Sequence, residues 1–347
     1  MTKPALLITI SAVAVDSSGL RMKSISKKSM LKKLSSRKSF IVMLLAFSAL
    51  TLSLGQQPCY AAGKKHHVIS SRKRTSLASL DSPRNAFREI YQVNGGPVLA
   101  SSKAIVLDQA SGEVIFAKDV DAQTPIASVT KLMTAMVVLD SQLPLEEILM
   151  VTDDDVDRIK GSSSKLPVGT ELTRSEMIHL ALMSSENRAA HALGRSYPGG
   201  LNAFVAAMNA KARQLGMLNS QFVDPTGLSS GNLSTASDLA KMVNAAYQYN
   251  HIRQVSTTPS QEFNVSRFNH PVNFANTNLL VRNSSERWDI GLSKTGYISE
   301  AGRCLVMQAK ISGKDVVLVF LNSVGKLSRI GDAERIRKWL EKEQPRG

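Results

Sequence analysis

The sequence is poor in cysteine, with only Cys59 and Cys304 among its 347 residues. Cys304 lies in an apolar run at residues 304–309, where a small buried hydrophobic side chain is the ordinary interpretation. A Cys-His hydrolase would need an exposed cysteine beside a base, and nothing near Cys304 in the sequence supplies one. Removal of Cys59 with a cleaved N-terminal leader would leave Cys304 alone, so no internal disulfide could form. Neither thiol catalysis nor a disulfide framework is expected.

The apolar run near the N-terminus is also too short to cross a membrane. It covers residues 40–54, which is 15 residues, whereas a spanning helix needs about 20. Seven basic residues at positions 23–38 lie directly before it, and the small residues Cys59 and Ala61 occupy the positions that determine signal cleavage. These features predict an N-terminal extension and signal peptide over residues 1–61, and hence a periplasmic protein. An uncleaved membrane anchor is the alternative.

Acidic residues are fewer than basic ones, 28 against 43, which gives a formal net charge of +15. Residues 1–61 hold nine of the basic residues and one acid, so the remaining chain has a net charge of +7. The polar, basic and aperiodic segment at 62–98 is predicted to be a flexible tether. No basic stripe interleaved with aromatic residues is present, so nucleic-acid binding is not expected. Loose association of the tether with the membrane or with anionic envelope polymers stays open.

The pattern of apolar residues predicts one large domain at 99–343, followed by a short tail at 344–347. Turn-rich segments separate short apolar runs at both ends of this domain, whereas capping boxes and longer apolar stretches predict helices between them. The expected elements are strands at 103–107, 114–117, 291–296, 304–311 and 315–321, and helices at 128–139, 177–183, 201–215, 239–247 and 332–343. Strands at both ends around a helical middle predict an α+β fold, with one antiparallel sheet flanked by helices and an all-helical subdomain.

Three short motifs follow one another along this domain: Ser128-Val129-Thr130-Lys131, Ser185-Glu186-Asn187 and Lys294-Thr295-Gly296. Each is weak alone, because a serine three residues before a lysine arises by chance in a chain of this length. Their order along the chain is that of the penicillin-interacting serine acyl-transferases.

The spacing within the motifs fits a nucleophile with its own base. Ser128 is predicted in the first turn of a helix, and the i, i+3 spacing places Lys131 on the same face. Serine needs a base at neutral pH, and lysine can serve where burial and a neighbouring cation lower its pKa. The free N–H groups at the helix start can hold an oxyanion. Ser185 and Asn187 fall between two helices, and Gly296 on a strand lets a substrate backbone approach.

Over residues 99–340 the chain resembles the low-molecular-mass penicillin-binding proteins, which are serine D,D-peptidases with a β-lactamase/transpeptidase-like fold. Four runs are similar to those of the D-alanyl-D-alanine endopeptidase subgroup: Ser184-Ser-Glu-Asn-Arg-Ala-Ala190, Tyr197-Pro-Gly-Gly200, Phe222-Val-Asp-Pro-Thr-Gly-Leu228 and Lys294-Thr-Gly-Tyr297. The resemblance implies that residues 99–343 are the catalytic domain.

The resemblance also implies a role for each motif residue. Ser128 would be the acylated nucleophile and Lys131 its base, while Ser185 would pass a proton to the leaving amine. The backbone N–H groups of Ser128 and Tyr297 would form the oxyanion hole. Substrate binding would fall to four residues of the second and third motifs, namely Asn187, Lys294, Thr295 and Gly296.

The function implied is that of a peptidoglycan D,D-endopeptidase, which hydrolyses D-Ala–diamino acid cross-links through a Ser128 acyl-enzyme. Its partners would be cross-linked peptides and, as inhibitors, β-lactam antibiotics. One alternative is a D-alanyl-D-alanine carboxypeptidase, which releases free D-Ala, and another is a non-catalytic penicillin-binding sensor or scaffold. The 51 residues after Gly296 leave no room for the extra β domain and membrane-binding tail of many carboxypeptidases, which favours the endopeptidase.

A β-lactamase would share the motifs but needs a carboxylate that activates water to hydrolyse the acyl-enzyme quickly. No Asp or Glu occurs between Asn187 and Asp224, so this activity is not expected.

Metal sites have little support in the sequence. His179 and His191 stand apart, and no His-Glu-x-x-His motif occurs. The alternating acids at 153–157 suggest a calcium loop, but Arg158 stands where such a loop requires glycine. Acids that follow Thr152 are better explained as a helix N-terminus. We therefore expect neither a metal ion nor a cofactor.

Overall fold

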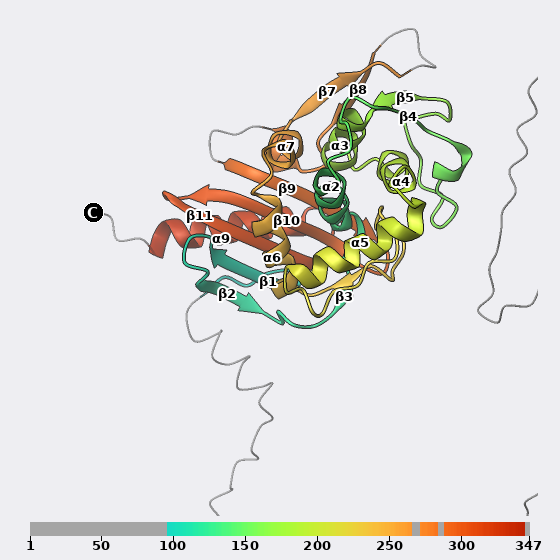
Figure 1. Ribbon diagram of the computed structural model, residues 1–347. Helices are drawn as coiled ribbons and strands as arrows, with labels where there is room; N and C mark the ends of the chain where they lie inside the picture. Colours follow the sequence, from blue (N-terminus) through green and yellow to red (C-terminus); the bar gives the residue numbers. More distant parts are fainter. Residues whose placement is uncertain (1–95, 266–270, 284–287, 344–347) are drawn as a thin grey trace, which may run out of the picture. The chain divides into compact units, whose positions relative to one another are not determined.

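The computed structural model describes residues 96–265, 271–283 and 288–343 (Figure 1). The expected leader at 1–61, the tether up to residue 95 and the tail at 344–347 lie outside the described residues.

Both ends of the domain contribute to one antiparallel sheet with the strand order β2-β1-β11-β10-β9. Its strands are β1 (Ser101–Asp108), β2 (Val114–Lys118), β9 (Asp289–Ile298), β10 (Gly302–Ile311) and β11 (Lys314–Ser323). Ala104 of β1 pairs with Phe320 of β11, so the two ends of the domain meet at the centre of the sheet as expected. The third motif lies on β9, which is an edge strand of this sheet.

Successive residues of the sheet strands point to two different cores, as the two-residue period of a strand requires. Leu305 and Met307 of β10 belong to one core, which α9 (Ser328–Glu343) covers through Ile336. Val306 belongs to the other core, which α6 (Ala236–Ala246) covers. Figure 1 shows these two helices on opposite faces of the sheet. The expected antiparallel sheet flanked by helices is confirmed.

The helical subdomain surrounds α2 (Thr130–Asp140), and nine of the eleven residues of this helix are buried. A helix that is apolar all round needs neighbours on every side. They are α3 (Arg174–Met183), α4 (Asn187–Arg195), α5 (Gly200–Gln214), α6 and α7 (Asn250–Ser256). The second motif falls in the short link between α3 and α4, as expected.

Several small elements were not expected from the sequence, because two- to four-residue strands carry too little periodicity to detect. They are the paired strands β3 (Thr124–Pro125) with β6 (Leu233–Ser234), β4 (Ile148–Met150) with β5 (Glu171–Thr173), and β7 (Ser260–Phe263) with β8 (Val272–Ala275), together with the short helix α8 (Leu279–Arg282).

Side-chain caps fix where two of the expected helices begin. Thr173 and Glu176 form the predicted capping box, in which each side chain bonds the backbone N–H of the other residue. Thr235 accepts the N–H of Asp238 at the start of α6. The Asp238 carboxylate does not return this bond but accepts the N–H of Asn219 instead, so it ties α6 to the preceding loop.

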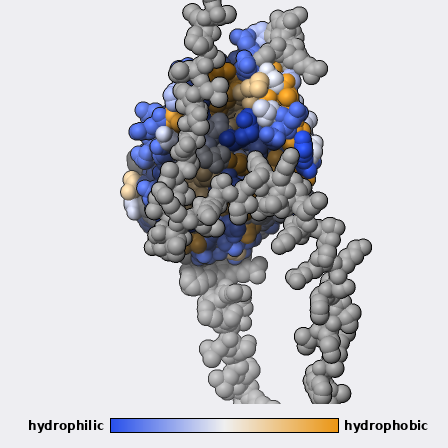
Figure 2. Space-filling view, turned by 45° about the vertical axis from the view of Figure 1, so that its right-hand side comes forward, coloured by the Kyte–Doolittle hydropathy of each residue, from blue (hydrophilic) through white to orange (hydrophobic). Residues whose placement is uncertain are grey.

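None of the helices among the described residues combines the length and the hydrophobicity that crossing a bilayer requires. On the part of the surface visible in Figure 2, hydrophobic areas are limited in size and separated by hydrophilic ones.

Candidate active site

The first motif lies where a tight turn meets the buried helix α2. Ser128 belongs to the 3-10 turn η1 (Ala127–Val129), and α2 begins only at Thr130. The expectation that Ser128 lies inside the α-helix is therefore wrong. Ala127 has a φ of 48°, a left-handed conformation that an α-helix excludes and that costs free energy in a non-glycine residue. The i, i+3 relation is kept, because Nζ of Lys131 is 2.9 Å from Oγ of Ser128.

Lys131 is fully buried and touches two further oxygen atoms. Its Nζ is 2.7 Å from Oδ1 of Asn187 and 2.6 Å from the carbonyl oxygen of Thr226. Burial lowers the pKa of Lys131 to about 7, although the carboxylates of Asp224 and Glu186 act in the opposite direction. Near neutral pH a large share of the molecules therefore carries an uncharged amine at this position.

The two oxygen neighbours orient this amine toward the serine. A carboxamide oxygen and a backbone carbonyl can only accept hydrogen bonds, so they bind the two N–H groups of a neutral amine. The lone pair is then left for the third neighbour, the hydroxyl of Ser128, which can donate its proton. This arrangement is what a general base for a serine nucleophile requires.

Lys294 and Ser185 form a second lysine–serine pair. Nζ of Lys294 is 2.9 Å from Oγ of Ser185 and 2.8 Å from the carbonyl oxygen of Thr295, and its side chain is buried. Burial lowers the pKa of Lys294 well below its usual value, and the positive charges of Lys131 and Arg329 lower it further. Ser185 has a φ of 63°, so both serines lie at or next to a left-handed residue.

Two glycines hold η1 between the third motif and a loop after α5. A Cβ on Gly296 of β9 would lie 3.1 Å from the backbone nitrogen of Ser128. A Cβ on Gly227 would lie 2.0 Å from the carbonyl oxygen of Ala127, and Gly227 also has a φ of 80°. Only glycine allows these approaches. They bring β9 and the nucleophile turn into direct contact.

The remaining motif residues line the same region. Oγ1 of Thr295 is 2.7 Å from Oγ1 of Thr277, and Tyr297 follows on β9 with 56% of its surface exposed. The structure thus brings Ser128, Lys131 and Asn187 into one set of contacts and Lys294 and Ser185 into another, with Gly296 beside the nucleophile. Their individual roles stay predictions.

Asn187 is oriented by residues that the sequence analysis did not assign to the site. Its Nδ2 donates to Oγ of Ser162 at 2.8 Å, and Oγ of Ser162 donates to Asp157 at 2.5 Å. Asp157 also accepts the backbone N–H groups of Ile159, Lys160 and Ser162. Burial would raise the pKa of Asp157, but these bonds outweigh it and lower the pKa to about 2. A folded turn therefore fixes the amide that touches Lys131.

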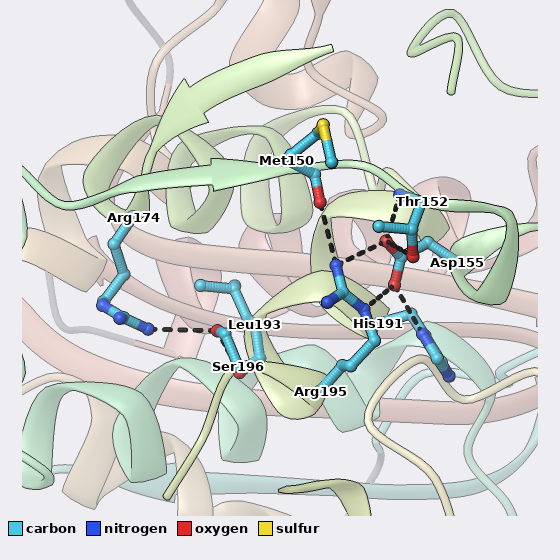
Figure 3. Close-up of polar contacts among 8 residues, drawn as sticks. All are labelled: Met150, Thr152, Asp155, Arg174, His191, Leu193, Arg195 and Ser196. Atoms are coloured by element: carbon cyan, nitrogen blue, oxygen red, sulfur yellow. Dashed lines mark hydrogen bonds and ion pairs between the residues drawn. The ribbon is translucent and has the colours of Figure 1, made fainter. Parts of the chain in front are cut away.

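The position of α4, which begins at Asn187, depends on a second buried carboxylate (Figure 3). Asp155 accepts hydrogen bonds from both His191 and Arg195, whose side chains converge on it from α4. Arg195 also donates to the carbonyl oxygen of Met150. The acids after Thr152 thus cap the short 3-10 helix η2 (Asp153–Asp155), as the helix-start interpretation expected. They also attach this helix to α4.

The loop that supplies the Thr226 carbonyl was not predicted as part of the site. Asp224 shapes this loop by accepting the backbone N–H groups of Thr226, Gly227 and Ser229. The Asp-Pro-Thr-Gly run was noted only as a mark of resemblance. Such a run of turn-forming residues does signal a tight turn, but not which distant residue it will touch.

Other candidate groups lie apart from this site. Cys304 is buried and donates weakly to the carbonyl of Ala301, and burial raises its pKa to about 11. His179 packs edge-on against Phe263, and burial lowers its pKa to about 4. Across residues 96–265, 271–283 and 288–343, no cluster of three or more His, Cys, Asp or Glu side chains could hold a metal ion.

Comparison with known proteins agrees with this geometry. The family model described as D-alanyl-D-alanine carboxypeptidase, peptidase S11, matches residues 91–325. The D-alanyl-D-alanine endopeptidase of Pseudomonas aeruginosa is 50% identical over 243 residues, which cover 70% of this chain and 78% of the relative. That of Escherichia coli is 47% identical over 245 residues, covering 71% and 78%.

A solved structure shares the fold as well. The Streptomyces K15 DD-transpeptidase superimposes with a TM-score of 0.65 at 27% identity, and the match covers 70% of this chain and 98% of that protein. A buried lysine beside a serine, the three motifs around one contact region and these relatives all point to the same enzymes. The chain therefore belongs to the D-alanyl-D-alanine carboxypeptidase family, peptidase S11, and is a serine hydrolase with the fold of the low-molecular-mass penicillin-binding proteins.

Proposed function

We propose that the protein is a peptidoglycan endopeptidase that hydrolyses the bond between D-Ala and a diamino acid in cross-linked peptides, through an acyl-enzyme on Ser128. The observation that carries this proposal is the contact between Ser128 and the fully buried Lys131, whose pKa is about 7. Lysine at this pKa can accept the serine proton at the pH of the periplasm.

Acylation begins when Lys131 takes the hydroxyl proton and Oγ of Ser128 forms a bond to the D-Ala carbonyl carbon. The backbone N–H groups of Ser128 and Tyr297 stabilise the oxyanion of the tetrahedral intermediate. The C–N bond then breaks, and the proton held by Lys131 moves to the leaving amine by way of the hydroxyl of Ser185, which contacts Lys294. A water molecule later hydrolyses the ester, which frees the donor peptide and restores Ser128.

Substrate binding uses the residues on both sides of the nucleophile. Asn187 holds the peptide amide, and the protonated form of Lys294 gives the cleft a positive charge. Thr295 bonds the carboxylate next to the scissile amide, and Gly296 leaves space for the substrate backbone. A β-lactam presents a carboxylate and a strained amide in the same arrangement, so it acylates Ser128 as an inhibitor.

The relatives favour the endopeptidase over the carboxypeptidase. Three relatives, each from a different bacterium, are 36–50% identical to this chain and are named D-alanyl-D-alanine endopeptidases. Those named carboxypeptidases, including DacF of Bacillus subtilis, are 27–30% identical. Glu186 belongs to the endopeptidase-like run, and its carboxylate accepts the hydroxyl of Ser164 at the edge of the site.

The N-terminal sequence supports export to the periplasm, where cross-linked peptidoglycan lies. The basic leader, the apolar run at 40–54 and the cleavage position after Ala61 carry this part of the proposal. The basic segment after residue 61 allows loose contact with the membrane or envelope polymers.

Digestion of purified muropeptides tests the activity. We expect cross-linked dimers to yield monomers, and the Ser128→Ala variant to yield none. Release of D-Ala from pentapeptides without loss of dimers would instead show a carboxypeptidase. If neither substrate is cleaved while a β-lactam still binds covalently, the protein is a penicillin-binding sensor.

A further inference from the structure

An ion pair joins the two sides of the site at the end of β9. Nζ of Lys160 lies 2.5 Å from Oε1 of Glu300, although 140 positions separate the two residues in the sequence. Lys160 belongs to the turn that Asp157 shapes and that orients Asn187 through Ser162. Glu300 lies in the turn between β9 and β10, three residues beyond Tyr297.

The order of the site residues along β9 gives the direction of a bound peptide. Lys294 contacts Ser185, so the leaving amine lies at the Lys294 end of the strand. Tyr297 follows and supplies an oxyanion N–H, so the scissile carbonyl lies beside it. The acyl half of the substrate must then continue past Tyr297 toward Glu300, along the open edge of β9.

The rise of an extended peptide places the next substrate residue near the turn that holds Glu300. An extended chain advances by about 3.4 Å per residue, so the residue before the cleaved D-Ala lies roughly one or two positions beyond Tyr297. In a peptidoglycan stem this residue is the diamino acid of the donor. Its side chain is long enough to reach the turn at Glu300. In many bacteria this side chain ends in both an ammonium and a carboxylate group.

The contact between Lys160 and Glu300 is exposed enough for a charged ligand to displace it. The side chains of Lys160 and Glu300 are 30% and 42% exposed, and an ion pair exposed to water contributes little to stability. The backbone beneath Lys160 is held in place, because its N–H binds Asp157. The hydrogen bond from Lys160 holds the pKa of Glu300 at about 2, so this carboxylate is charged throughout the neutral range.

We propose that Lys160 and Glu300 bind the charged end of the donor diamino acid, with Lys160 on its carboxylate and Glu300 on its ammonium. This inference rests on the proposed endopeptidase function. In the free enzyme the two side chains neutralise each other's charge in the ion pair. When a stem peptide binds along β9, each charge exchanges its partner for the opposite charge of the ligand. The pair thereby selects donors whose side chain ends in both groups.

The experiment compares two cross-linked dimers that differ only in the donor diamino acid. One carries both the ammonium and the carboxylate, and the other carries the ammonium alone, as in lysine. We expect Lys160→Gln to lower the ratio of kcat/KM for the first dimer over the second by roughly tenfold, the size of one lost charge-assisted contact. Glu300→Gln should lower kcat/KM for both dimers, since both present an ammonium.

Two controls separate binding from support of the fold. Glu341→Gln removes another carboxylate that is 42% exposed and paired with a cation, but on α9, so it should retain the wild-type ratio. Acylation by a β-lactam, which contains no diamino acid, reports whether the Lys160 turn and β9 keep their places. If the ratio is unchanged in Lys160→Gln, or if β-lactam acylation falls as much as peptide cleavage, the inference is wrong. If the wild-type enzyme cleaves neither dimer, the proposed function itself fails.

Discussion

At the scale of single residues, the reaction depends on a lysine that burial keeps partly uncharged. Lys131 is surrounded by hydrogen-bond acceptors, which favour its charged form, yet it is fully removed from solvent, which favours the neutral form. The desolvation is the larger effect, because the pKa falls to about 7. The like-charge repulsion expected between the two lysines acts on Lys294, whose pKa is also lowered.

The rate of acylation should therefore rise with pH through an ionisation near pH 7. Below this pKa Lys131 is protonated and cannot accept the serine proton, and above it the amine is neutral. Because Lys131 and Lys294 interact, the apparent pKa belongs to the pair. Stopped-flow measurement with a fluorescent penicillin gives the profile. A rate that is flat between pH 6 and 9, which spans about one unit below and two above this pKa, would contradict Lys131 as the base.

Replacing Lys131 by arginine should remove the base and keep the positive charge, because arginine stays protonated in proteins. We expect acylation to fall by about 100- to 10,000-fold, the range for loss of a general base. Intact-mass analysis after timed exposure to a β-lactam measures this. A near-native rate would mean that Lys131 acts only through its charge or its packing.

Ser128→Ala should abolish both covalent labelling by β-lactams and peptide cleavage. The second serine, Ser185, contacts Lys294, and its proposed role is to pass a proton to the leaving amine and not to attack the substrate. Mass spectrometry of the treated variant provides the measurement. An adduct that survives in the alanine variant would place the nucleophile elsewhere.

At the scale of the elements, the site exists because turns and helices are fixed to one another by a few buried groups. Gly227 lets its loop touch η1, and Asp155 holds η2 against α4. Gly227 has no side chain, and the side chain of Asp155 bonds His191, Arg195 and Thr152 rather than Ser128. Gly227 instead positions η1, which contains Ser128. Asp155 positions α4, which begins at Asn187, and Asn187 contacts Lys131.

Gly227→Ala should therefore slow acylation strongly, since its Cβ would lie 2.0 Å from the carbonyl oxygen of Ala127. Gly216→Ala is the matched control, because Gly216 has a similar φ of 70° but no atom near the added methyl. The control should lose only about 1 kcal/mol of stability and retain its acylation rate. Denaturant unfolding and β-lactam acylation measure the two effects. Equal rates in both variants would refute the contact argument.

Asp155→Asn should weaken the attachment of α4 by about 2 kcal/mol, because it removes charge from hydrogen bonds at a fully buried position. Burial alone would raise the pKa of Asp155, but the bonds from His191, Arg195 and Thr152 lower it to about 2. A lowered carboxylate pKa stabilises the fold above the ordinary value near 4, and this contribution is lost as the pH falls toward 2.

Asp153→Asn, an exposed neighbour in η2, is the control for this variant. Its stability should match that of the wild type at pH 7. Urea unfolding at pH 7 and pH 3 compares the variants. The stability difference between Asp155→Asn and the wild type should shrink at the lower pH, and a constant difference would show that Asp155 does not titrate as described.

At the scale of the whole molecule, the three carboxylates that act on Lys131 in the described part of the chain all make hydrogen bonds within the protein. Glu186 holds Ser164, Asp157 holds the turn before Ser162, and Asp224 holds the loop with Gly227. Each of these acids is engaged by hydrogen bonds that shape the backbone. Their charges act on Lys131 from a distance, and their hydrogen bonds within the protein compete with any water molecule at the ester.

The penicilloyl adduct should consequently persist much longer than in a β-lactamase, which uses a glutamate-activated water. Intact-mass spectra recorded over time after removal of excess β-lactam follow the loss of the adduct. Recovery of free enzyme within seconds would show that an efficient hydrolytic water is present after all.

The sequence alone determined the class of the fold and the pairing within the first motif. Turn residues and caps act within a few positions, so the hairpin of β1 and β2, the start of α3 at Thr173 and the i, i+3 relation of Ser128 and Lys131 were all predictable. The antiparallel sheet followed from the positions of its strands at both ends of the domain. Strands of two to four residues escaped prediction because they carry no measurable period.

The tertiary structure decided the state of the catalytic lysine and the surroundings of each motif. The Thr226 carbonyl lies 95 positions from Lys131, Asn187 lies 56 positions away, and Glu300 meets Lys160 across 140 positions. Such contacts arise only when packing brings distant segments together, and no local pattern records them. The same packing removes water from Lys131 and so sets its pKa. A spacing of three residues shows that a base can reach the serine, but only the buried environment makes that lysine a base near neutral pH.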